Sequence, residues 1–295
     1  QVASGRSQVT GLRSQRTSPQ SPISNPQSLL LSAYTLSGFA ALGYEVVWAR
    51  ILAIFTLDAV FSFSIMLTVY LLGLTLGGWI GAAWLRRRPA RWADFGWLQI
   101  AVGLTGLGTL FVFAALPGVT LEGLLGSYSV GKLILFEFLV GFVALIVPTT
   151  CLGLLFPVVV SLYTGEDAKA VGGQVGRISA WNTGGAILGS LVVGFVLIPW
   201  LGLQTTLVTL ALVNLLIGLV LFWRVSPRRA NWWIAPAAGA AIALLLIGLR
   251  PSSLYLGFRQ GPSEHMIFYG EGVETTVAVF EVPESNFKVS FVNGR

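Results

Sequence analysis

Charged residues are scarce in this chain. Only 10% of its 295 residues are Asp, Glu, Lys or Arg, whereas 55% are hydrophobic; a soluble globular domain carries about 25% charged residues. The deficit is concentrated between Leu29 and Leu249, where long apolar runs follow one another. This pattern excludes a soluble enzyme and a disordered protein. It predicts an all-α integral membrane protein, because the runs approach the ~20 residues that a spanning helix needs.

Cysteine and histidine are almost absent. The single cysteine, Cys151, and the single histidine, His265, exclude a disulfide framework and a Cys/His metal cluster. Cys151 lies in an apolar run, where a free cysteine behaves as a small hydrophobic residue. His265 is expected at the surface, in a linker. The sequence therefore predicts no metal site and no cofactor site in this chain.

Acidic residues are missing from residues 1–28, which are rich in Ser, Gln and Pro and include three Arg. This composition predicts a disordered basic tail. The tail lacks the apolar core of a secretory signal.

Basic residues gather in alternate loops. The 18 Lys and Arg outnumber the 12 Asp and Glu, and the clusters comprise Arg86–Arg88 with Arg91, Lys169 with Arg177, and Arg224 with Arg228 and Arg229. Such alternation is typical of the positive-inside rule. It indicates a lipid bilayer rather than a nucleic acid as the partner. We expect a bacterial inner or plasma membrane, with the N-terminus cytoplasmic and the C-terminus extracytoplasmic.

About seven transmembrane helices are predicted within 29–249, at 30–56, 60–85, 93–116, 131–162, 177–199, 205–223 and 233–249. The fourth run would be a helix of about 48 Å, longer than the ~30 Å hydrocarbon core. Pro148 and Pro157 lie inside it, so it forms either one kinked helix or two short spans. An even number of crossings must separate the two Arg-rich loops at 86–92 and 224–230. One kinked helix is therefore favoured.

The composition changes after the last apolar run. Residues 250–260 are read as a linker, and 273–281 and 286–292 alternate apolar and polar side chains as half-buried strands do. Two strands are not stable without a partner surface. We therefore expect 261–295 to be the start of an incomplete soluble domain.

Two resemblances follow from local motifs. Gly73, Gly77 and Gly81, followed by the run WLRRRP at 84–89, resemble the second helix and basic loop of the major facilitator superfamily, although the usual acid of that loop is missing. The order of the first six predicted helices also resembles one half of that fold.

The second resemblance covers more of the chain. The segment SGFAALGYEVVWAR at 37–50, Pro148–Thr150, Asn182–Ala186 and Phe268–Gly272 are similar to membrane proteins fused to a spermidine synthase-like (polyamine aminopropyltransferase-like) domain. The resemblance implies that decarboxylated S-adenosylmethionine would bind a Rossmann-like domain beyond Arg295. No Gly-rich loop here follows a strand and opens a helix. We therefore expect the chain to be catalytically silent.

Ionisable residues inside the predicted spans are the candidate functional residues, because charge is costly there. Glu45 has two open interpretations, a substrate or proton role and a structural one. Arg50, five residues later, lies ~140° around the helix and should meet a different partner. Glu137 could pair with Lys132, and Asn182 could bond across helices.

Glycines at helical spacing form a second candidate set. Gly73, Gly77, Gly81, Gly185 and Gly189 fit close helix packing through small faces. In a transporter, the same faces would also permit sliding.

Three functions stay open at this stage. The first is the membrane part of a spermidine synthase-fused protein, the second an accessory subunit of a larger membrane complex, and the third a half-transporter for a small amine that pairs as a homodimer.

Overall fold

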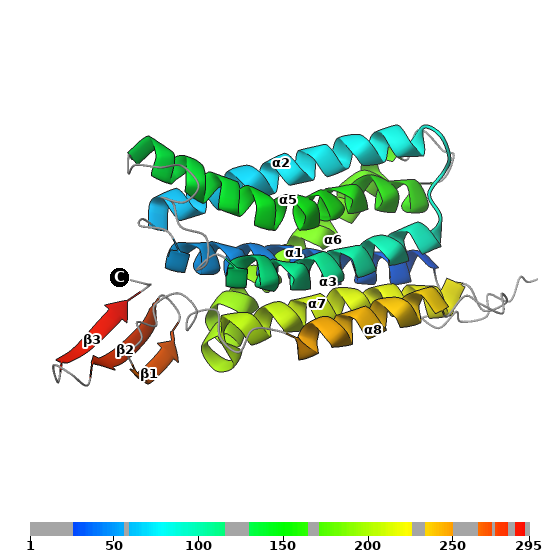
Figure 1. The fold of residues 1–295 in the computed structure, drawn as a ribbon. Coiled ribbons are helices and arrows are strands. Elements are labelled where there is room, and N and C mark those ends of the chain that lie inside the picture. Colours follow the sequence, from blue (N-terminus) through cyan, green and yellow to red (C-terminus); the bar gives the residue numbers. More distant parts are fainter. Residues whose placement is uncertain are drawn as a thin grey trace, which may run out of the picture.

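The computed structural model describes residues 26–55, 59–115, 130–164, 171–225, 234–249, 265–272, 275–282 and 287–292. Long helices lie side by side, and a small sheet sits at one end of them (Figure 1). The helices are α1 (Pro26–Phe55), α2 (Ala59–Leu85), α3 (Trp92–Ala115), α5 (Val130–Tyr163), α6 (Val171–Val192), α7 (Ile198–Val225) and α8 (Ile234–Gly248), with a π-helical stretch, η2 (Val193–Leu197), between α6 and α7. The strands are β1 (His265–Glu271), β2 (Thr276–Val282) and β3 (Phe287–Val292).

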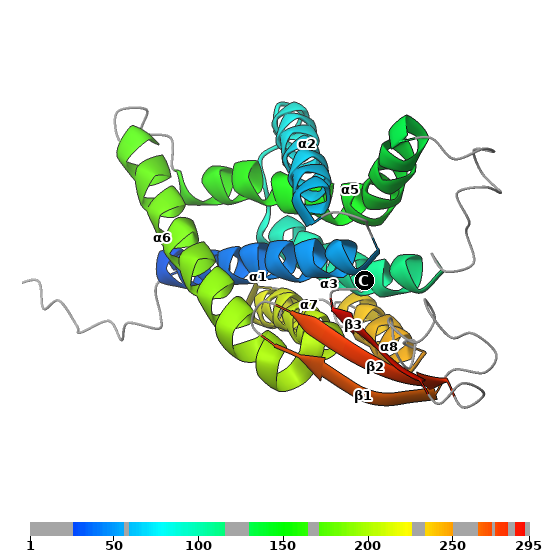
Figure 2. The ribbon, with the colours of Figure 1, turned by 90° about the vertical axis from the view of Figure 1, so that its left-hand side faces the viewer.

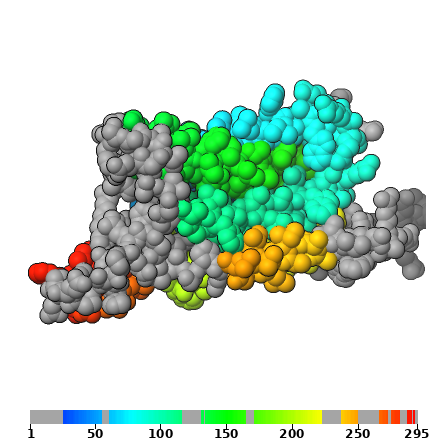
Figure 3. All heavy atoms as spheres, viewed as in Figure 1, coloured from blue at the N-terminus to red at the C-terminus, as the bar shows by residue number. Residues whose placement is uncertain are grey.

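Helix α1 forms the centre of the bundle. It packs against α6, α7 and α2, and Figure 2 shows it between these elements. Its aromatic residues Tyr44 and Trp48 are fully buried, whereas Trp79, Val143 and Trp200 on other helices are largely exposed. Large apolar side chains on the outside are compatible with a membrane protein, whose exterior contacts lipid. Figure 3 shows one such face, formed by α2, α5, α3 and α8.

Five described helical segments are long and apolar enough to cross a membrane. One of them, Val171–Phe222, has 52 residues, and a straight helix of that length would measure about 78 Å. It is broken at Gly202, whose φ of 79° lies in the left-handed region that favours glycine. Before the break α6 and η2 pack on α1, and after it the rest of α7 also packs on α1, so the chain folds back at Gly202.

The seventh predicted span is not confirmed at full length. It corresponds to α8, which has 15 residues and is shorter than the ~20 of a typical crossing. The major-facilitator-like arrangement of the first six helices is likewise not confirmed.

Helix α5 is one continuous helix of 34 residues that includes Pro148 and Pro157, as the charge argument predicted. Its course is bent (Figure 2). Thr149 and Thr150, which follow the first proline, donate to the carbonyls of Leu145 (2.6 Å) and Ile146 (2.7 Å). Such back-bonding satisfies carbonyls near a proline and favours a bend.

The strands form an antiparallel sheet in the order β1-β2-β3. Both predicted strands are present, at slightly later positions, and Ala278 and Phe280 of β2 are buried. The expectation of only two strands was wrong, because β1 occupies the stretch that begins at His265. Its sequence, HMIFYGE, does not alternate, so it gave no period-two signal.

Candidate functional site

The described structure places Arg50 at a junction between the helices and the sheet. Arg50 lies near the end of α1, and its Nη2 donates to the carbonyl oxygen of Gly272 at 2.9 Å. Gly272 follows β1 directly, and its own N–H donates to the carbonyl of Thr275 at 2.7 Å in the turn to β2. The central helix therefore holds the sheet through a charge-assisted hydrogen bond, which is roughly twice as strong as a neutral one.

Glu271 makes the second contact of this junction. Its Oε2 accepts the backbone N–H of Leu203 at 2.5 Å, and its Oε1 accepts the hydroxyl of Tyr269. Leu203 follows the Gly202 break, so its N–H belongs to the first turn of a helix and lacks an intrahelical partner. A carboxylate is favourable at this position, because helix N-termini carry partial positive charge.

Gly202 shapes this contact as well as the chain reversal. Its positive φ turns the following N–H toward the sheet, and a Cβ at this position would lie 3.3 Å from Glu271 Oε2. We call the contacts among Arg50, Gly272, Glu271, Gly202 and Leu203 the helix–sheet junction. Across this junction Arg50 and Glu271 each bond to a main-chain group, so these contacts position the sheet on the helices.

Glu45 points elsewhere. It is half-buried on α1, and its carboxylate lies close enough to Tyr70 on α2 to act on that hydroxyl electrostatically. Arg50 instead bonds to Gly272 at the sheet, so the structure assigns the two charged residues of α1 to different surroundings.

The other polar candidates lie apart from the junction. Glu137 is buried on α5 with 6% of its surface exposed, and it is engaged in polar interactions there. Asn182 is half-buried on α6, where a Cβ on Gly38 of α1 would collide with its carbonyl and amide oxygens. Asn182 therefore marks a close approach of two helices.

The candidate glycines lie at two helix contacts. A Cβ on Gly73, Gly77 or Gly81 of α2 would collide with Thr149, Thr150 or Pro157 of α5. Similarly, Gly185 and Gly189 of α6 pack directly on the main chain of α1, against the carbonyls of Thr35 and Phe39. Both contacts bring helices closer than alanine would allow.

A carboxylate does meet the basic loop after α2, although not from the expected motif position. Asp94 at the start of α3 accepts two hydrogen bonds from Arg88, both at 2.8 Å. The Arg88 guanidinium also lies 4.7 Å from the ring centre of Trp84. The hydrogen bond to Asp94 raises the pKa of Arg88. Asp94 is thus the carboxylate partner of Arg88 in this turn.

A buried polar cluster links three of the helices. Trp48 Nε1 donates to Thr109 Oγ1 at 3.2 Å, and Asn214 Nδ2 donates to the Tyr44 hydroxyl at 3.4 Å. The rings of Tyr44 and Trp48 stack with centres 5.0 Å apart. These bonds link α1 to α3 and α7. The contacts span 61 and 170 positions, so no local pattern could reveal them.

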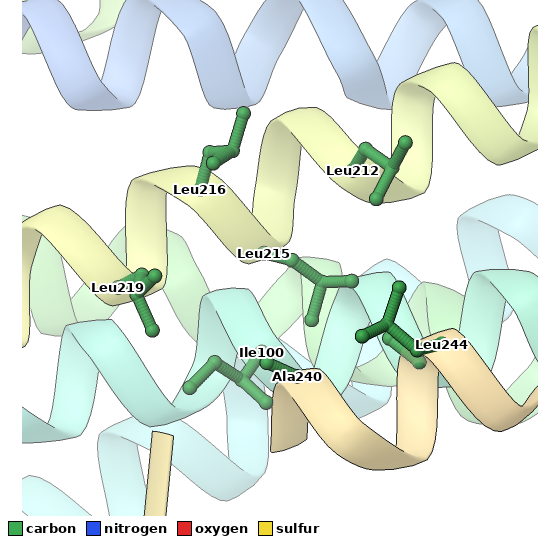
Figure 4. A pocket seen from close by; sticks show the side chains of 8 residues that line it. Ile100, Leu212, Leu215, Leu216, Leu219, Ala240 and Leu244 are labelled. Atoms are coloured by element: carbon green, nitrogen blue, oxygen red, sulfur yellow. The ribbon is translucent and has the colours of Figure 1, made fainter. Parts of the chain in front are cut away.

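Metal-ligating side chains do not gather in the described part of the chain. Within the described ranges, no group of three His, Cys, Asp or Glu could hold a metal ion. An apolar crevice of about 170 Å³ lies among α3, α7 and α8, and Figure 4 shows its aliphatic lining, which includes Ile100, Leu215 and Leu244. It offers no charged or hydrogen-bonding side chain, so it does not suit an amine.

Comparison with known proteins gives two relatives. The chain is 30% identical over 221 residues to polyamine aminopropyltransferase 2 of Streptomyces coelicolor. The aligned residues are 74% of this chain and 38% of the relative. It is 27% identical over 236 residues to polyamine aminopropyltransferase 1 of Ralstonia nicotianae, covering 76% and 41%. No protein-family model and no solved structure matches. The chain is thus homologous to polyamine aminopropyltransferases, and it spans about two-fifths of their length.

Proposed function

We propose that this chain is a membrane domain that anchors and positions an aminopropyltransferase-type domain. The observation that carries the proposal is the helix–sheet junction, in which Glu271, the last residue of β1, binds α7 and Gly272, the next residue, binds α1. A sheet that is fixed at two points would hold an attached domain in one orientation relative to the membrane. The homology supports this interpretation, since both relatives are named polyamine aminopropyltransferases.

The same proposal includes seven crossings, a first half like that of a major facilitator, a cytoplasmic N-terminus and an extracytoplasmic sheet. Support comes from the position of the sheet, which lies at the opposite end of the bundle from the turn between α2 and α3 (Figure 1). Five helices lie between this turn and the sheet, namely α3, α5, α6, α7 and α8. Five crossings would place the turn and the sheet on opposite sides of the membrane. A short α8 reaches across when the bilayer thins or polar flanks extend toward the interface.

Cysteine labelling in intact cells tests this topology. In a Cys151→Ala background, we expect Ser290→Cys on β3 to react with a membrane-impermeant maleimide from outside. Arg87→Cys should react only after permeabilisation, because it lies in the Arg-rich turn expected inside. Both positions are exposed, so access depends on the side of the membrane. Labelling of both from one side would contradict seven crossings.

We also propose that decarboxylated S-adenosylmethionine binds a part of the longer relatives that lies outside the present sequence. The purified 295-residue chain is therefore expected to show no aminopropyl transfer from this donor to putrescine. A longer protein that carries the same segment followed by a Gly-rich strand–helix loop is the positive control. Clear turnover by the 295-residue chain would contradict the proposal. The accessory-subunit and half-transporter functions stay predictions from the sequence.

A further inference from the structure

Helices α1 and α6 frame a pocket at the bundle end opposite the sheet. Both helices begin at that end and are closest where Gly185 meets the carbonyl of Thr35. Nearer the bundle end, a pocket of about 240 Å³ lies between them, with the end of α5 as its third wall. The lining residues are Gln27, Ser28, Leu31, Ser32, Tyr163, Arg177 and Trp181.

The lining changes from apolar to polar along the helix axes. One turn, or about 6 Å, from the Thr35–Gly185 contact lie Leu31 on α1 and Trp181 on α6. A further turn outward lie Ser28 and Arg177. From the bundle centre outward, an aliphatic and an aromatic side chain are therefore followed by a cation and a hydroxyl. A phospholipid has the same order, with its acyl chains toward the bilayer centre and its phosphate at the surface.

The charge of the pocket is positive. Arg177 lines it, and no acidic side chain is found among its described lining residues. Arg88, at the same end of the bundle, instead forms a salt bridge with Asp94. A guanidinium matches two phosphate oxygens at once, and the hydroxyl of Ser32 is a suitable further donor.

We propose that this pocket binds the headgroup phosphate of an anionic phospholipid, with Arg177 as its principal ligand. The proposal rests on the membrane placement made above but not on the link to aminopropyltransferases. A free phosphate ion presents the same oxygens without acyl chains, so the experiment must separate the two sources.

The test uses the full 295-residue chain in phosphatidylcholine nanodiscs doped with phosphatidylglycerol. Native mass spectrometry after release measures how much phosphatidylglycerol the protein retains. We expect Arg177→Gln to weaken retention about tenfold or more, because it removes charge-assisted hydrogen bonds to the phosphate and not only the general attraction of a basic residue. Arg177→Lys keeps the charge and should retain part of the binding. Arg87→Gln, an exposed residue of the α2–α3 turn, is the matched control and should change little.

Several outcomes would overturn the proposal. Equal losses in Arg177→Gln and Arg87→Gln would show attraction to general surface charge, and unchanged retention in Arg177→Gln would exclude the site. In detergent, phosphatidylglycerol but not inorganic phosphate should raise the unfolding temperature; an equal rise with phosphate would assign the pocket to a free anion. A chain that does not enter nanodiscs contradicts the membrane placement, whereas one that enters and retains no phosphatidylglycerol contradicts this site alone.

Discussion

Alanine at Gly77 is expected to destabilise the helix bundle, whereas alanine at the adjacent Gly78 should not. A Cβ on Gly77 would collide with the carbonyl of Thr150 and would lie 2.8 Å from the main chain of Gly153 on α5. Main-chain atoms cannot rotate away, so α2 and α5 must separate along their contact. Overpacking of this kind costs about 1–3 kcal/mol. Unfolding of the purified protein by denaturing detergent or heat measures the difference.

Gly78 provides the matched control, because a Cβ there meets nothing within 4 Å. Gly78→Ala should leave stability unchanged or raise it by up to about 1 kcal/mol through helix propensity. The same comparison can be repeated on α6, where Gly185 meets the main chain of α1 and Gly184 meets nothing. Equal stabilities of Gly77→Ala and Gly78→Ala would refute the packing role.

A double variant adds a sharper check. Gly153 is the reciprocal residue on α5, since its Cβ would lie 2.8 Å from the Cα of Leu74. Once Gly77→Ala has separated the helices, Gly153→Ala should cost less than it does alone, because residues in one contact are not additive. Full additivity would mean that the two glycines do not share one contact.

Helix positions could be predicted from this sequence because each long apolar run marks one helix. The runs at 60–85, 93–116 and 131–162 correspond to α2, α3 and α5 within one or two residues. Apolar length and charge placement suffice here, since every main-chain polar group must be satisfied within the helix. The strand β1 could not be predicted in this way, because its pairing with β2 depends on residues outside its own sequence.

The helix–sheet junction could be predicted only in part. The cost of charge in an apolar run marked Arg50 as a candidate, but its acceptor lies 222 positions away. The acceptor Glu271 lies 68 positions from Leu203. Leu203 contributes a main-chain N–H, which every residue except proline has, so the sequence does not mark it. The residue types identified a candidate, and the chain topology determined its partner.

Loss of the Glu271 carboxylate is expected to release the sheet from the bundle while the bundle stays folded. Glu271→Ala leaves the Leu203 N–H at a helix start without its acceptor, and an unsatisfied donor of this kind costs about 1–3 kcal/mol. A cost of ~1.4 kcal/mol corresponds to a tenfold change in an equilibrium, so opening of the sheet should rise about tenfold or more. Hydrogen exchange at the Gly272 amide and limited proteolysis of 265–292 measure this opening. The unfolding temperature of the helices should change little.

Glu281→Ala is the matched control, because Glu281 lies in the same sheet, on β2 opposite Lys288. Loss of a single cross-strand pair costs only about 0.2–1 kcal/mol. Arg50→Gln tests the other contact of the junction. Since each contact stabilises the closed sheet, the double variant Arg50→Gln/Glu271→Ala should open more than either single variant. Equal exchange in Glu271→Ala and Glu281→Ala would mean that the sheet is not held by the bundle, and the positioning function would then be wrong.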